Sequence, residues 1–266
     1  MMRPLRSLIG RRAAAPPAPG PAAPDLPRPE TATYVVGDLH GRVDALELML
    51  ELIDAHIGGT GSTDPRLVFV GDYVDHGPDS TAVLARMQEL TGQFPDNVTC
   101  LMGNHERMLL DFLSDPPMRG PRWMRAGGAA TLESYDIETD ALEPTADASV
   151  WRDAAERFRA ALGAAAQDWI AARPLSWQSG NLWVVHAGAD PARDMAAQSA
   201  RVLLWGHPEF EHAARGDDAW IAHGHVERDT PVFAEGRIGV DTAAWSTGKL
   251  TAVAIKPDGS HAFLQT

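Results

Sequence analysis

Five short segments of the chain place carboxylate, amide or imidazole side chains next to glycine. Each follows a stretch of apolar residues, and together they hold most of the ten histidines. Taken singly, an aspartate or histidine at the end of a strand more often forms a turn or a cap than a functional site. Glycine lets the backbone turn sharply, so together the segments can bring their polar side chains to one edge of a sheet. They are 37–41 (GDLHG), 71–77 (GDYVDHG), 103–106 (GNHE), 186–188 (HAG) and 223–225 (HGH).

The side-chain types in these segments favour two-metal hydrolysis. Mixed carboxylate, amide and imidazole ligands suit Mn, Fe or Zn, and the lack of thiolates in the set argues against a structural zinc site. Two cations about 3.5–4 Å apart need a bridging carboxylate, lower the pKa of a bound water and stabilise the oxygens of a phosphoryl group in transfer. We therefore expect two divalent metal ions, with Mn²⁺ as the first expectation and Fe or Zn as alternatives.

Alternating strand and helix patterns can position the polar segments. The first part of the chain predicts strands over 33–36, 67–70 and 98–102, and helices over 43–56, 80–90 and from Glu106 onward. The region 115–176 is mostly helical and carries Trp123, Trp151 and Trp169. Later strands are predicted over 182–185, 220–222, 238–240, 251–255 and 261–264. The pattern indicates an α/β architecture with its site at the carboxyl ends of strands.

The composition limits the class of protein. The 266 residues are 44% hydrophobic and 22% charged, which is typical of a globular chain. A formal net charge of −13 disfavours general binding of nucleic acid, because an acidic surface repels a phosphate backbone. The single cysteine, Cys100, cannot close an intramolecular disulfide and is typical of a reducing compartment.

Residues 1–30 differ in composition from the rest of the chain. Alanine, proline and five arginines dominate this segment, which predicts disorder. We expect one catalytic domain over 31–266. The chain offers neither the apolar stretch of a signal peptide nor the run of about 18 apolar residues that a membrane span requires. We therefore expect a cytoplasmic protein.

The motifs GDLHG, GDYVDHG, GNHE, VVHAG and AHGHV, in this order, resemble the phosphoprotein phosphatase branch of the calcineurin-like metallophosphoesterases. The resemblance runs from about Tyr34 to Leu250 and extends, in bacterial members, to 123–135 (WMRAGGAATLESY), 203–210 (LLWGHPEF) and 240–250 (VDTAAWSTGKL). It implies a metallophosphoesterase fold, in which two mixed β-sheets pack as a sandwich flanked by helices. The region 115–176 is then a helical insertion in that domain.

The resemblance also implies a role for each polar residue. Asp72 bridges the two metals, and His105 is a general acid that Asp75 orients. His223 and His225 compete for the last ligand position, because an alternating strand points both to the same side. The resemblance favours His225, which aligns with the histidine of the family's Gly-His-Thr pattern. The implied metal ligands are Asp38, His40, Asp72, Asn104, His186 and His225.

Three positions depart from the family's pattern, two of them in the same way. His76 and His207 stand where relatives usually carry arginines. Arginine is always charged, whereas imidazole loses its charge above its pKa, so the paired replacement indicates a changed grip on substrate. Drift to lower activity and chance substitution at the rim are the alternatives. Ala126 replaces a family asparagine, and Arg125 beside it supplies a positive group. The expected phosphate-binding residues are His76, His207, Asn104 and Arg125.

The activity implied is hydrolysis of a phosphoester by direct attack of metal-bound hydroxide on phosphorus. A serine/threonine protein phosphatase acting on a phosphorylated protein is the leading expectation. The alternative is a dinucleoside polyphosphate hydrolase. The expected partner is thus a phosphorylated protein or a small phosphoester substrate. A second alternative is a non-catalytic phosphate-binding module. The presence of His105 argues against this module, because a protein that only binds phosphate has no need of a general acid.

Overall fold

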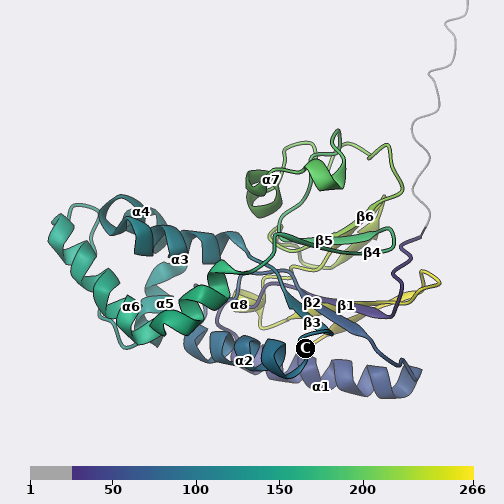
Figure 1. The fold of residues 1–266 in the computed structure, drawn as a ribbon, viewed down its shortest axis with the longest axis horizontal. Helices are drawn as coiled ribbons and strands as arrows, with labels where there is room; N and C mark the ends of the chain where they lie inside the picture. Colours follow the sequence, from purple (N-terminus) through teal and green to yellow (C-terminus); the bar gives the residue numbers. More distant parts are fainter. Residues whose placement is uncertain (1–25) are drawn as a thin grey trace, which may run out of the picture.

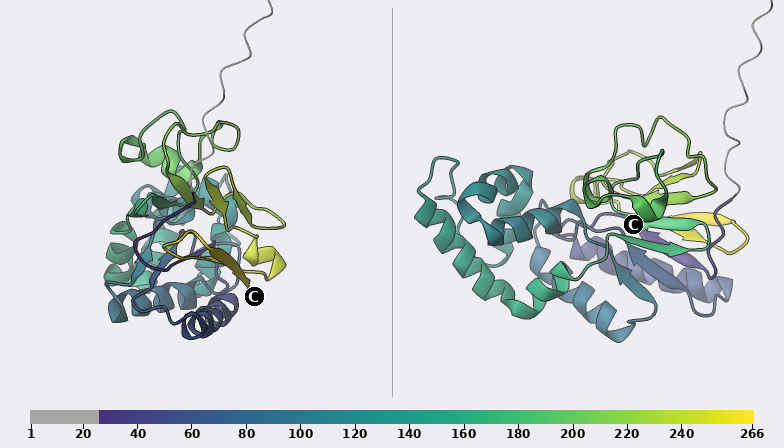
Figure 2. Two further views of the ribbon diagram at one scale, coloured as in Figure 1. Left: turned by 90° about the vertical axis from the view of Figure 1, so that its right-hand side faces the viewer. Right: turned by 45° about the horizontal axis from the view of Figure 1, so that its top comes forward.

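Two five-stranded sheets lie face to face at the centre of the molecule (Figures 1 and 2). The computed structural model describes residues 26–266. Helices α1 (Val43–Thr60) and α2 (Ser80–Gln93) lie along the outer face of the first sheet, and a group of helices extends to one side (Figure 1). The α/β class and the two mixed sheets expected from the sequence are confirmed.

The first sheet carries the strands that precede the first three polar segments. β1 pairs with β2, and β2 with β3, in parallel. β9 runs antiparallel to both of its neighbours, β1 and β10. Because β1, β2 and β3 are parallel, the loops that follow them leave the sheet at the same edge. In spatial order the strands are β10 (His261–Gln265), β9 (Thr251–Ile255), β1 (Thr33–Val36), β2 (Arg66–Phe69) and β3 (Val98–Cys100).

The second sheet carries the strands that precede the last two polar segments. β5, β6 and β8 are parallel, and the outer strands β4 and β7 are antiparallel to their neighbours. The expected strands at 182–185, 220–222 and 238–240 are present, with shifts of up to one residue at their ends, whereas β4 and β7 were not expected. In spatial order the strands are β4 (Ser176–Ser179), β5 (Leu182–Val185), β6 (Trp220–His223), β8 (Arg237–Gly239) and β7 (Val232–Ala234).

Strand alternation divides the buried apolar residues between two cores. In β1, Val35 packs between the sheets with residues such as Val68 and Val184. Its neighbours Tyr34 and Val36 point the other way and pack under the helices. This is the period of two that a strand imposes on its side chains, and it holds β1 rigidly between two packed layers.

Helices occupy most of the expected insertion at 115–176 and form a lobe beside the sheets (Figures 1 and 2). Trp151 and Trp123 are buried inside this lobe. No helix within residues 26–266 has both the length and the apolar character needed to cross a membrane. The lobe consists of α3 (Asn104–Ser114), α4 (Pro116–Trp123), a π-turn (Met124–Gly128), α5 (Ala129–Ser134) and α6 (Ala148–Ala171).

Most of the segment expected to be disordered, 1–30, lies outside the described residues, which begin at residue 26. Residues 26–30 are held against the turn between β4 and β5. The backbone N–H of Arg28 donates to Asn181 Oδ1 (2.6 Å), and that of Glu30 donates to Ser179 Oγ (2.8 Å). The backbone groups of these last residues thus find partners on the second sheet, and the expectation of disorder for 1–30 stays a prediction.

Candidate metal centre

The loops after β1 and β2 are tied together by their backbones. The N–H groups of Leu39 and His40 both donate to Asp72 O, at 3.0 and 2.8 Å. The backbone φ angles of several polar residues lie in the left-handed region, with 42° for His40, 53° for Asp72, 73° for Asp75 and 61° for His225. Such conformations are unfavourable for residues other than glycine and concentrate at functional sites. The fold therefore holds these side chains in place at the cost of unfavourable backbone conformations.

Asp72 lies at the middle of the cluster. Its Oδ2 is 3.5 Å from His40 Nε2 and 3.4 Å from His186 Nε2. Asp38 and His40 group with Asp72 on one side, and His186 and His225 group with it on the other, with ligand atoms within 4.8 Å of one another in each group. The cluster can thus hold two cations that share the carboxylate of Asp72.

The histidine rings are held in one orientation by backbone carbonyls. His40 Nδ1 is 2.7 Å from Val74 O, and His186 Nδ1 is 3.1 Å from Val70 O. A ring that donates Nδ1–H to a carbonyl presents the lone pair of Nε2 to the other side, and here Nε2 faces Asp72. Asn104 Oδ1 lies 2.7 Å from His186 Nε2. The ring nitrogens and the amide oxygen are thus placed where they can act as ligands of cations.

His225, and not His223, joins the cluster. The backbone N–H of His225 lies 3.2 and 3.1 Å from the two carboxylate oxygens of Asp38. The ring of His223 instead packs edge-on against Phe210 with its Nδ1 2.9 Å from Gly224 O, and it belongs to none of the candidate metal groups among the described residues. Burial lowers the pKa of His223 to about 4, so the ring is a neutral core residue.

Crowding and burial make the cluster unfavourable for carboxylates without cations. Burial raises the pKa of Asp72 to about 8, although the nearby His105 opposes this effect. Burial and the carboxylates of Asp241 and Asp72 raise the pKa of Asp38 well above its usual range. Divalent cations would reverse both shifts, because they stabilise the ionised ligands. The residues present therefore fit a pair of divalent metal ions.

His105 is held by a carboxylate at the edge of the cluster. Its Nδ1 is 2.7 Å from Asp75 Oδ2, and its Nε2 is 3.8 Å from Asp72 Oδ2. Burial lowers the pKa of His105, but the charge of Asp72 and the hydrogen bond that His105 donates to Asp75 outweigh burial and raise this pKa to about 9. A protonated imidazole beside the candidate metals can deliver a proton to a leaving oxygen.

Three residues outside the implied sets of metal ligands and phosphate contacts support the site. Glu106 accepts hydrogen bonds from the backbone N–H groups of Asp72 (2.9 Å), Tyr73 (2.7 Å) and Gly103 (2.9 Å), and so fixes two loops at once. Trp123 Nε1–H donates to Asp75 Oδ2 (2.8 Å), and Thr131 Oγ–H donates to Asp75 Oδ1 (2.6 Å). For Thr131, the similarity of 123–135 to bacterial family members was the only signal in the sequence.

The residues expected to bind phosphate lie in three places. The ring of His76 lies beside those of His40 and His105, with centroids 4.9 and 5.3 Å away, and stacks on Trp245 at 4.7 Å. Burial and His105 lower the pKa of His76, which argues against a charged ring there. His207 lies farther out and, with His225, lines a cavity of about 440 Å³.

Arg125 is exposed in the π-turn. Two residues farther along the same turn, the backbone O of Gly127 accepts a hydrogen bond from the N–H of His76 (3.3 Å). The turn therefore lies against the loop after β2, and this puts Arg125 in a segment that borders the candidate metal centre.

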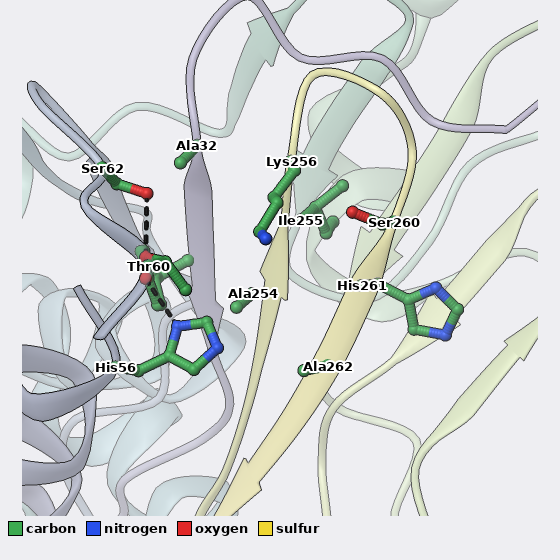
Figure 3. Close-up of a pocket in the computed structure, with 11 residues that line it drawn as sticks. Ala32, His56, Thr60, Ser62, Ala254, Ile255, Lys256, Ser260, His261 and Ala262 are labelled. Carbon is green, nitrogen blue, oxygen red and sulfur yellow. Dashed lines mark hydrogen bonds between the residues drawn. The ribbon is translucent and has the colours of Figure 1, made fainter. Parts of the chain in front are cut away.

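A separate pocket of about 190 Å³ lies at the opposite end of β1, between α1 and the β9–β10 hairpin (Figure 3). It is lined by Tyr34, His56 and Lys256 among others, and a hydrogen bond of 2.8 Å joins Tyr34 Oη to His56 Nδ1. None of the candidate metal ligands lines it. The clustered ligands therefore place the chemistry at the other end of the strand.

Comparisons with known proteins agree with this geometry. A zinc-dependent endopolyphosphatase of Saccharomyces cerevisiae is 32% identical over 105 residues, which are 40% of this chain and 29% of that protein. A symmetrical bis(5'-nucleosyl)-tetraphosphatase of Nitrosomonas europaea is 31% identical over 186 residues, which are 70% of this chain and 53% of that protein. The chain thus spans about half or less of the length of these curated relatives.

A solved structure provisionally named a diadenosine tetraphosphatase has the same fold. It matches with a TM-score of 0.58 and 19% identity, and the match covers 88% of this chain and 93% of that one. The pattern of the calcineurin-like phosphoesterase family matches residues 32–254, which include all five polar segments. The resemblance seen in the motifs is thereby confirmed, and the chain belongs to the calcineurin-like phosphoesterase family.

Proposed function

We propose that this chain is a dimetal phosphohydrolase that cleaves a phosphoanhydride bond in the polyphosphate bridge of dinucleoside polyphosphates. The observation that carries the proposal is the pairing of a cation-binding cluster with a proton donor. The Nε2 atom of His105 lies 3.8 Å from the carboxylate of Asp72, and Asp75 holds its other nitrogen. A module that only bound phosphate would gain nothing from this arrangement, so it argues against the non-catalytic alternative.

The two metal ions, when bound, would supply a water of lowered pKa and positive charge for the phosphoryl oxygens. In this proposal Asp38 and His40 would hold one ion, Asn104, His186 and His225 would hold the other, and the carboxylate of Asp72 would serve both. His105 donates its Nε2 proton to the leaving oxygen, while Asp75 keeps the ring in place through Nδ1. No covalent bond forms between the protein and the phosphoryl group.

The proposed substrate class differs from the leading expectation of the sequence. A serine/threonine protein phosphatase was expected first, with dinucleoside polyphosphates as the alternative. The curated relatives include symmetrical bis(5'-nucleosyl)-tetraphosphatases, which supports the alternative over the protein phosphatase. The two candidate substrates differ in the group attached to the reacting phosphate. In a dinucleoside polyphosphate this group is a polyphosphate with a nucleoside, and in a phosphoprotein it is a polypeptide.

His76 and His207 are proposed to contact phosphate oxygens as hydrogen-bond donors. Because the pKa of His76 is lowered, a neutral ring would donate one N–H, in place of the two-pronged grip of a charged arginine. His207 lines a cavity that also contains the ligand His225. Arg125 is proposed as a further contact from the π-turn, and Asn104 as a contact that also binds metal.

Turnover of matched substrates tests the proposal. The purified protein with Mn²⁺ is expected to cleave diadenosine tetraphosphate, and to do so with a higher kcat/KM than it shows for a phosphoserine peptide. The Asp72→Asn variant serves as the control, since it removes the shared carboxylate charge and should lose both metal and turnover. Faster cleavage of the phosphopeptide would return the assignment to a protein phosphatase. Binding without turnover of any phosphoester would leave only a phosphate-binding module.

A further inference from the structure

Two neighbouring cavities lie on either side of the short helix α7 (Ala200–Trp205) and share two lining residues, and we call the pair the α7 groove. One half has a volume of about 440 Å³ and includes the candidate metal ligand His225 together with His207. The other half has a volume of about 380 Å³ and includes Arg107 and Arg173. Arg201 and Trp205 line both halves. The groove therefore begins at the candidate metal centre and continues past α7.

The lining of the α7 groove carries three arginines and one carboxylate, that of Glu211, which pairs with Arg228 outside the lining. The chain carries a net charge of −13, and many of its arginines are neutralised by carboxylates, as Arg86 is by Glu47 and Glu89. Within residues 26–266, by contrast, no carboxylate pairs with Arg201 or Arg173. Arg173 donates to the backbone O of Trp169, and its guanidinium lies over that ring at 4.2 Å. These guanidinium groups keep donors for an anionic ligand.

Trp205 gives the groove an aromatic side chain between its two halves. The guanidinium of Arg122, from α4, lies 5.9 Å from the centre of the Trp205 ring. This contact brings the helical lobe and the second-sheet side of the molecule together at Trp205. An indole ring flanked by arginines suits a ligand that has both phosphates and a planar base, because guanidinium forks match phosphate oxygens and aromatic rings stack on bases.

We propose that the α7 groove binds the part of a dinucleoside polyphosphate that extends beyond the reacting phosphate. Arg201 and Arg173 contact its distal phosphates, and Trp205 stacks on its base. This inference rests on the proposed function and adds to it the site that selects long, nucleotide-bearing substrates over simple phosphomonoesters. His225 at one end of the groove and Arg173 at the other give the direction in which the substrate extends.

Substrates of different length test the groove. In Arg201→Glu, kcat/KM for diadenosine tetraphosphate is expected to fall at least about tenfold more than kcat/KM for p-nitrophenyl phosphate, mostly through KM. Arg157→Glu is the matched control, because Arg157 is an exposed arginine on α6 that does not line the groove, and it should change neither value by more than about twofold. Equal losses for both substrates in Arg201→Glu, or no loss, would overturn the proposal.

A second variant distinguishes binding of the base from binding of the phosphates. Trp205→Ala is expected to weaken inhibition by ADP about tenfold while leaving inhibition by tripolyphosphate, which has no base, within twofold. Weakening of both inhibitors to the same extent would contradict a base-stacking role for Trp205.

Failure of the groove can be told apart from failure of the proposed function. If the wild-type protein hydrolyses p-nitrophenyl phosphate but not diadenosine tetraphosphate, the proposed function is wrong. The groove is then judged by calorimetric titration with intact diadenosine tetraphosphate. Weaker binding by Arg201→Glu than by Arg157→Glu would still support a nucleotide site, and equal binding by the two variants would overturn it. Loss of phosphopeptide turnover alone in Arg201→Glu would assign the groove to a peptide and also overturn the proposal.

Discussion

Asp75 links the helical lobe to the proposed proton donor. Its Oδ2 accepts from His105 Nδ1 and Trp123 Nε1, and its Oδ1 accepts from the hydroxyl of Thr131. With three donors fixed around a fully buried carboxylate, the side chain has one orientation, and so has the imidazole that it holds. The orientation of the His105 ring therefore depends on residues of the helical lobe.

Replacing His105 with asparagine tests its role as a proton donor. General acids contribute about 10²–10⁴-fold to a rate, and a good leaving group needs little protonation. We expect His105→Asn to reduce kcat at least about 100-fold for phenyl phosphate, and far less for p-nitrophenyl phosphate. Metal content measured by mass spectrometry should stay unchanged. Equal losses with the two substrates would rule out proton donation to the leaving oxygen.

Thr131 offers an isosteric test of how Asp75 is held. Thr131→Val removes the hydroxyl that donates to Asp75 Oδ1 and leaves a buried acceptor unsatisfied, which costs about 1–3 kcal/mol. We expect a lower Tm together with a lower kcat for phenyl phosphate. Thr131→Ser keeps the donor and should restore kcat to within about threefold of wild type. A serine variant as slow as the valine variant would show that the hydroxyl is not what matters.

At the scale of elements, strands with a clear apolar pattern could be predicted, and strands without one could not. The expected strands at 33–36, 182–185 and 251–255 coincide with β1, β5 and β9. β4 has the sequence SWQS, and β7 has only three residues, of which Ala234 is exposed. These outer strands pair through their backbones with a neighbour on one side only, so their side chains carry too little of the alternation that sequence reading needs.

Glycines are needed where the loops approach the ligands most closely. A Cβ atom added to Gly224 would lie 1.9 Å from Asp38 Oδ1, whereas one added to Gly216 would meet no atom within 4 Å. We expect Gly224→Ala to displace Asp38 and to lower bound metal below half of the wild-type content. Gly216→Ala is the control and should keep wild-type content and activity. A fully loaded Gly224→Ala protein would show that Asp38 is not needed to hold its ion.

At the scale of the whole molecule, the candidate centre joins the two sheets. Asp38, Asp72 and Asn104 follow strands of the first sheet, while His186 follows β5 and His225 follows β6 of the second. The sequence predicted that these segments converge, because five motifs in family order imply it. It could not predict which ring nitrogen faces Asp72, nor that lobe residues hold Asp75, since both depend on packing between segments far apart in the chain.

The metal-free protein is expected to lose stability between pH 7 and pH 9. The pKa of Asp72 is raised to about 8 and that of His105 to about 9, so the folded state holds protons there that the unfolded chain releases at lower pH. A raised pKa gives stability that is lost as the pH rises through the folded value. The buried rings of His40 and His186 have lowered pKa values. Their protonation therefore changes the stability only at pH values below about 6.5.

Thermal unfolding with and without metal checks this expectation. The Tm of chelator-treated protein should fall from pH 7 to pH 9, since each proton difference changes the free energy of unfolding by about 1.4 kcal/mol per pH unit. Saturating Mn²⁺ should raise the Tm most at pH 9, because ions bind the deprotonated ligands and bridge the two sheets. Asp72→Asn should flatten the metal-free profile and abolish the effect of Mn²⁺. A flat profile in metal-free wild type would mean that neither Asp72 nor His105 holds a proton in the folded state above pH 7.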